Sequence, residues 1–122
     1  MTQKYDLQDR LIKFSVNIID LTEKLPSNPA GKHISNQLLR SGTSPAANYG
    51  EAQAAESRAD FIHKMKISLK ELRETDIWLK IVERKEYISN IEVDCIIQET
   101  NELISIFYKS IKTAKENQYL NK

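Results

Sequence analysis

The sequence predicts an all-α fold, specifically an antiparallel up-down-up-down four-helix bundle. Apolar residues recur at spacings of three and four over four long segments, which is the pattern of one face of a helix. No segment alternates apolar and polar residues as a strand does. Only three glycines and three prolines occur in 122 residues, too few for the many turns of a sandwich or barrel. The whole chain, 1–122, is expected to form one domain.

The first helix is expected at about 6–24. Its apolar residues follow one another at alternating steps of four and three, which places them on a single bundle-facing stripe. They are Leu7, Leu11, Phe14, Ile18, Leu21 and Leu25. Pro26 follows directly and ends the helix, because proline cannot continue the hydrogen-bond ladder.

The second helix is expected at about 29–56, with Asn28 as its N-cap and Pro29 in its first turn. Pro45 lies inside this range and removes a hydrogen bond to the carbonyl of Ser41. We expect a kink near Pro45. The alternative is a fresh start, with Ser44 as a new N-cap. The kink is favoured because a row of polar residues continues through the proline in register.

The third and fourth helices are expected at about 57–86 and 90–117. Ser57 and Asp60 resemble a capping box at the start of the third helix, and Ser89 with Glu92 forms one for the fourth. The loops between the helices are short, so neighbouring helices should run antiparallel.

The polar row on the second helix is the most informative pattern in the chain. Its members recur at steps of three and four and therefore share one flank of the helix. They are His33, Gln37, Arg40, Ser44, Asn48 and Glu51. A solvated helix flank is the simpler interpretation. The alternative is a network in which Arg40 and Glu51 meet third-helix partners such as Ser68 or Glu71.

Two helices carry more apolar surface than one bundle face requires. The extra residues lie opposite the core-facing stripes, and surfaces of this kind mark interaction sites. They are Tyr5, Ile12, Val16 and Ile19 on the first helix, and Ile67, Trp78, Ile81 and Val82 on the third. Self-association is the favoured interpretation. The alternative is a wide core with scattered exposed residues.

Five basic residues gather on the third helix and could contact phosphate groups. They are Arg58, Lys64, Lys66, Lys70 and Arg73. Acidic residues lie close to them in the sequence, and the chain as a whole has 18 basic and 17 acidic residues. An ordinary solvated helix face is therefore favoured over a phosphate-binding surface. Lysines 109, 112 and 115 near the end of the fourth helix suit the helix dipole without any ligand.

The sequence has no nucleotide-binding, hydrolase or metalloprotease motif, so we expect neither catalytic residues nor a cofactor. His33 and His63 have no second ligand at a metal spacing, and no metal site is expected. Cys95 is the only cysteine and is expected to be buried and inert. A single cysteine, no apolar run of about 18 residues and a polar start together predict a cytoplasmic protein without membrane contact.

Several motifs resemble a known family. They are Leu25–Pro26, Gln37–Ser41, Ser44–Glu51, Phe61 and Ser68–Leu72. In this order they are similar to the four-helix-bundle proteins encoded by intervening sequences in bacterial 23S ribosomal RNA genes, also called the S23 ribosomal protein family. That family is related to the accessory variability proteins of diversity-generating retroelements. The resemblance covers roughly residues 5–115.

The resemblance implies a homopentameric ring of non-enzymatic bundles. Its motif positions correspond to Arg40, Ser44, Asn48, Glu51, Ser68 and Glu71. The retroelement relatives bind nucleic acid through a basic surface. We therefore expect a scaffold whose partners are further copies of itself and RNA or a ribonucleoprotein, with no small-molecule substrate. The alternative is a protein-interaction adaptor that binds no nucleic acid.

Overall fold

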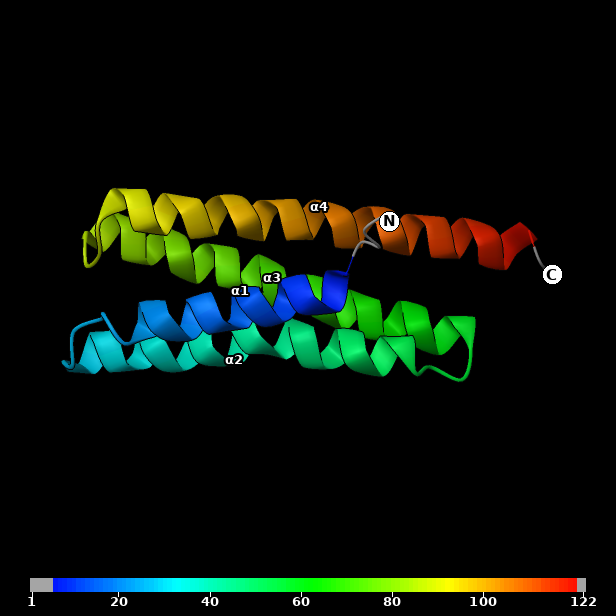
Figure 1. Cartoon of the computed structure of the whole chain (residues 1–122), viewed down its shortest axis with the longest axis horizontal. Helices are drawn as coiled ribbons and strands as arrows, with labels where there is room; N and C mark the ends of the chain where they lie inside the picture. The colour runs from blue at the N-terminus through cyan, green and yellow to red at the C-terminus, as the bar shows by residue number, and fades with distance from the viewer. Residues whose placement is uncertain (1–5, 121–122) are drawn as a thin grey trace, which may run out of the picture.

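The computed structural model describes residues 6–120, with side chains up to residue 117, and this part of the chain contains four α-helices and no strand (Figure 1). The helices are α1 (Leu7–Thr22), α2 (Pro29–Gln53), α3 (Arg58–Lys85) and α4 (Asn90–Leu120). Helix α2 ends earlier than expected because its last turn tightens, so that the Ala54 amide donates to the Glu51 carbonyl at 3.1 Å.

Short polar side chains begin the first three helices. Asp6, Asn28 and Ser57 each accept a hydrogen bond from the amide three residues later, at 2.9, 2.8 and 3.0 Å respectively. These caps satisfy amides that would otherwise have no partner in the first turn. Helix α3 ends at Lys85 and is capped by Glu86, whose φ of 57° is left-handed. The chain reverses there and enters α4 after a short loop.

The helices pack in sequence order around a shared core. Helix α2 lies between α1 and α3, and α3 packs on α4, whereas α1 and α4 make comparatively few contacts. The α1–α2 and α3–α4 connections lie at one end of the molecule and the α2–α3 connection at the other (Figure 1). The helices within residues 6–120 all lack the continuous apolar stretch that a membrane-spanning helix requires.

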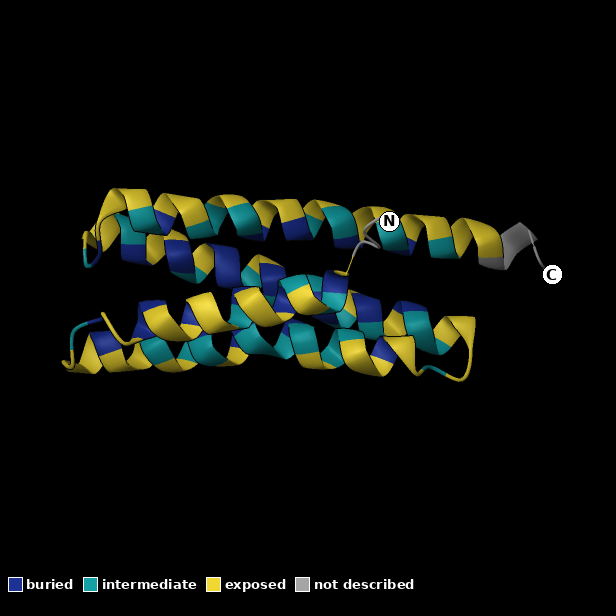
Figure 2. Ribbon diagram, viewed as in Figure 1, coloured by how far each residue is buried: buried dark blue, intermediate teal, exposed yellow. Residues whose placement is uncertain are grey.

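Buried residues face one another between the helices, and the outer faces are exposed (Figure 2). The entire apolar stripe from Leu7 to Leu25 is buried, as its spacing predicts. Phe14 and Phe107 are the largest fully buried side chains. Tyr49 of α2 packs edge-on against Phe107 of α4, with ring centroids 5.9 Å apart, so the core joins helices across the bundle.

Helix α2 continues through Pro45 as one helix, so a fresh start at Ser44 is wrong. Neighbouring helices donate side-chain hydrogen bonds to carbonyls in this region. Gln8 Nε2 donates to the Ala46 carbonyl at 3.0 Å, and Ser68 Oγ donates to the Pro45 carbonyl at 3.4 Å. These contacts fasten α2 to both α1 and α3 around the proline.

Candidate functional site

Arg40 is the centre of a polar network between α2 and α3. Its Nη1 lies 2.9 Å from Glu71 Oε2, and its Nη2 contacts Glu74 and donates to Gln37 Oε1 at 2.9 Å. The hydrogen bond with Glu74 is the largest cause of a raised Arg40 pKa. Arg40 therefore meets Glu71, one of the two partners considered from the sequence, together with Glu74, which the sequence argument did not include.

The network extends from Glu74 to an aromatic pair. Trp78 Nε1 donates to Glu74 Oε2 at 3.0 Å, and the Trp78 ring packs edge-on against His33 with centroids 5.6 Å apart. The Trp78 hydrogen bond, followed by the contact with Arg40, lowers the pKa of Glu74. His33 thus joins the network through its ring.

The remaining members of the polar row make more local contacts. Asn48 Nδ2 donates to Ser44 Oγ at 2.8 Å, one turn away on the same helix. Glu51 pairs with Lys64 of α3 at 3.1 Å rather than with Ser68. Ser68 is fully buried and is the donor to the Pro45 carbonyl. The row therefore contributes contacts both within α2 and across the α2–α3 boundary.

A second layer of hydroxyl groups lies beneath this network. Thr75 Oγ1 donates to Ser41 Oγ at 3.0 Å, and both side chains are fully buried. No buried side-chain nitrogen or oxygen in the described part of the chain is left without a hydrogen-bond partner. Buried polar pairs that are fully satisfied specify one register between two helices. The geometry of the α2–α3 boundary therefore suits helix alignment.

The five basic residues of α3 do not form one cluster. Lys64 faces α2 and pairs with Glu51, while Lys70 lies near Glu74 and helps to lower the pKa of that carboxyl. Arg58 lines a cavity of about 760 Å³ with Phe61 and Lys109. Helical periodicity distributes these cations over different sides of α3, so proximity in sequence did not predict proximity in space.

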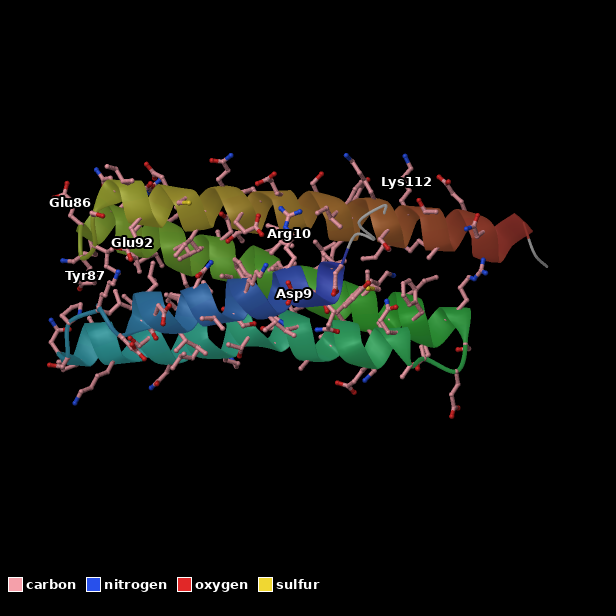
Figure 3. All side chains as sticks on the ribbon, in the orientation of Figure 1. Asp9, Arg10, Glu86, Tyr87, Glu92 and Lys112 are labelled. Atoms are coloured by element: carbon pink, nitrogen blue, oxygen red, sulfur yellow. The ribbon has the colours of Figure 1, made fainter. Side chains whose placement is uncertain are left out.

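Lys66 and Arg73 instead face the lysines of α4. With Lys112 and Lys115 they line a cavity of about 320 Å³, which we call the α3–α4 basic groove. Its other lining residues are Leu69, Tyr108 and Ile111. Figure 3 labels Lys112 on the C-terminal half of α4. Lys115 approaches Lys66 closely enough to lower its pKa.

Sequence reasoning missed the α4 contribution to this groove. It attributed Lys112 and Lys115 to the helix dipole alone. The signal was present, because Tyr108, Ile111, Lys112 and Lys115 are spaced as one helix face. The sequence does not show which face of α3 packs against these residues.

Three of the predicted interface residues form an exposed stripe on α1. Ile12, Val16 and Ile19 are 49%, 48% and 38% exposed, and we call them the α1 stripe. On α3, Ile81 and Ile77 are also exposed, and we call this pair the α3 stripe; Ile77 was not anticipated.

The other residues expected on these apolar surfaces lie elsewhere. Ile67 and Trp78 are half-buried. Val82 is fully buried, so its assignment to an outer stripe is wrong, because this turn of α3 directs it into the core. Tyr5 lies outside the described residues.

A second groove follows the boundary between α1 and α4. Its volume is about 410 Å³, and its lining includes Arg10, Phe14, Ile96 and Cys95. Cys95 is exposed, so the expectation that it is buried is wrong. It lines this groove at the boundary where α1 and α4 make few contacts. Within residues 6–120, no group of three or more metal-ligating side chains is placed to hold a metal ion.

Comparison with known proteins identifies a family over most of the chain. Residues 3–109 match the family model described as 23S rRNA-intervening sequence protein. The fold is similar to the crystal structure of a protein of unknown function from the S23 ribosomal protein family of Bacteroides thetaiotaomicron. That match has a TM-score of 0.82 and 39% sequence identity, and it covers 88% of this chain and 99% of the other. No curated protein matches the sequence.

Proposed function

The chain belongs to the family of 23S rRNA-intervening sequence proteins, and from that premise we propose that it is a non-enzymatic scaffold. The scaffold is a homo-oligomer of helical bundles in the cytoplasm, with five copies in a ring. It holds RNA or a ribonucleoprotein. The polar residues of the α2–α3 boundary maintain the bundle and do no chemistry on a substrate.

The observation that carries the oligomer is the presence of two exposed apolar stripes on helices that do not pack against each other. Within one protomer α1 contacts α2 and α4 but not α3, so the α1 stripe and the α3 stripe do not cover each other. A contact between the α1 stripe of one copy and the α3 stripe of the next is head-to-tail. Repeated with a suitable rotation, such a contact closes into a ring and buries both stripes.

Native mass spectrometry of Ile12→Asp and Ile19→Asp tests the oligomer. We expect a ring for the wild-type protein and dissociated protomers for both variants, because a charge in an apolar interface is costly to desolvate. Circular dichroism should show unchanged helicity. Ile91→Asp is the matched control, since Ile91 is 86% exposed on α4 and belongs to neither stripe. A monomeric wild-type protein, or variants that stay assembled, would contradict the proposal.

The protomer of this scaffold is an up-down-up-down bundle with α2 kinked near Pro45. The alternating positions of the connections support the topology (Figure 1). The missing amide hydrogen of Pro45 supports the kink, since the Ser41 carbonyl loses its helical donor. A crystal structure of Pro45→Ala should show a straighter α2 than the wild-type protein. An equal bend in both would contradict the kink.

The RNA component rests on the family and on the basic residues of α3. Protein purified without nuclease should carry absorbance at 260 nm and bound RNA in its native mass spectrum. Changing Lys64, Lys66 and Lys70 to Glu should abolish RNA binding and flatten its dependence on salt. A ring that carries no RNA, and that binds a partner protein with an affinity independent of salt, would instead favour a protein adaptor.

A further inference from the structure

The α3–α4 basic groove differs in its charge balance from the cavity beside Arg58 and from the groove between α1 and α4. Those two cavities are lined by carboxylates as well as cations, with Glu56 in one and Glu99 and Glu102 in the other. The groove contains Lys66, Arg73, Lys112 and Lys115 and no carboxylate. None of these four is in an ion pair within residues 6–117.

Two rigid helices hold these cations together in spite of their repulsion. Lys66 extends from α3 and Lys115 from α4, and the pKa of Lys66 is lowered because Lys115 is its immediate neighbour. A bound anion would relieve this repulsion and would gain from cations that are already in place. The groove is therefore organised for negative charge before any ligand arrives.

The remaining lining narrows the class of anion. Leu69 and Ile111 supply apolar surface, and Tyr108 is 55% exposed beside the cations. Lysines and arginines contact phosphates, and an exposed aromatic ring offers a face on which a base can stack. This combination is the chemistry of single-stranded nucleic-acid binding. Duplex RNA would satisfy the cations but would leave the tyrosine without a base.

We propose that the α3–α4 basic groove binds a short segment of single-stranded RNA, with phosphates on its four cations and a base on Tyr108. This inference rests on the proposed function for its choice of RNA as partner. It places the RNA contact on residues of both α3 and α4, rather than on the basic residues of α3 alone. The net charge of +1 agrees with a local contact, because the molecule as a whole is not a polycation.

The salt dependence of binding gives the proposal a quantitative test. Four phosphate contacts to a single strand predict that log K falls with log salt with a slope of about −3. Removing two cations should change that slope to about −1.4. A fluorescently labelled 12-residue oligouridylate, followed by fluorescence anisotropy across a range of KCl concentrations, measures both the affinity and the slope.

The deciding variant is Lys112→Gln/Lys115→Gln, since both side chains are exposed and their loss should not affect folding. We expect at least a tenfold loss of affinity and the shallower slope. Lys13→Gln/Lys32→Gln is the control, because it removes the same charge from exposed positions on α1 and α2. Tyr108→Phe should keep the affinity and Tyr108→Ala should reduce it, which separates stacking from the hydroxyl group.

The outcomes distinguish the groove from the proposed function. RNA binding that survives in Lys112→Gln/Lys115→Gln but is lost in Lys64→Gln/Lys70→Gln would overturn the groove and leave the RNA scaffold intact. No binding by the wild-type protein would overturn both. Tighter binding of duplex RNA, or of vesicles containing anionic lipid, would overturn the single-stranded partner.

Discussion

Arg10 of α1 and Glu99 of α4 are joined by two side-chain hydrogen bonds, from Nε to Oε2 at 2.8 Å and from Nη2 to Oε1 at 2.6 Å. Figure 3 shows Arg10 on α1 beside α4. The pair spans the boundary at which these two helices make the fewest contacts of any adjacent pair. A two-point contact of this kind fixes orientation as well as distance.

The Arg10–Glu99 pair should contribute measurably to stability because of this geometry. The two side chains are 27% and 28% exposed, so water screens them only partly. A double-mutant cycle with Arg10→Met and Glu99→Gln in urea unfolding should give a coupling energy of about 1 kcal/mol. The coupling should decrease in 1 M salt. A coupling near zero at low salt would show that the α1–α4 boundary does not depend on this pair.

Gly42 should be intolerant of a side chain because α1 approaches it closely. A Cβ there would lie 2.7 Å from Cγ2 of Ile18, a fully buried and stiff β-branched residue. Gly42→Ala should therefore destabilise the protein by about 1–3 kcal/mol in spite of the higher helix propensity of alanine.

Gly50→Ala is the matched control for Gly42→Ala. Position 50 is exposed, and its Cβ would meet only Gln8 Oε1, at 3.3 Å. We expect a change in stability of no more than about 1 kcal/mol, because the contact requires Gln8 to move by only a few tenths of an ångström and helix propensity favours alanine. Thermal unfolding followed by circular dichroism compares the two variants directly. Equal effects at both positions would contradict the close α1–α2 contact.

Glu74 should make the fold sensitive to acid. Its pKa lies below the ordinary value of 4.5, through the hydrogen bond from Trp78 and the contact with Arg40. Its contribution to stability is therefore present above pH 4.5 and is lost as the pH falls through the lowered pKa. Trp78 is the only tryptophan, so its fluorescence reports this titration. Arg40→Gln should raise the pH midpoint of this fluorescence titration, because Arg40 helps to lower the Glu74 pKa. An unchanged midpoint would contradict the network.

Glu83 should respond to pH in the opposite direction. Its pKa is raised by the neighbouring carboxyl of Asp94, across the α3–α4 boundary. A raised pKa means that this pair stabilises the fold below pH 4.5 and loses that contribution as the pH rises through the folded-state pKa. Glu83→Gln should therefore raise the melting temperature at pH 7, and the gain should shrink at pH 4. The same gain at both pH values would contradict the assignment.

The resemblance of the motifs to the 23S rRNA-intervening sequence family was confirmed by the family model and by the solved S23-family structure. The four helices were predictable because their signals are local. Periodic apolar residues and capping side chains act within one or two turns, so the sequence alone specifies them. The core stripe of α1, from Leu7 to Leu25, could be identified residue by residue for this reason.

The tertiary structure alone decided which polar side chains meet. Lys66 and Lys70 are close in sequence, yet Lys66 lies beside Lys115 of α4 and Lys70 lies near Glu74. The same dependence directs Val82 into the core and leaves Cys95 exposed. A helix determines which of its residues share a face, whereas the neighbour that each face meets depends on how whole helices pack. The α3–α4 basic groove therefore forms only when α3 and α4 pack against each other.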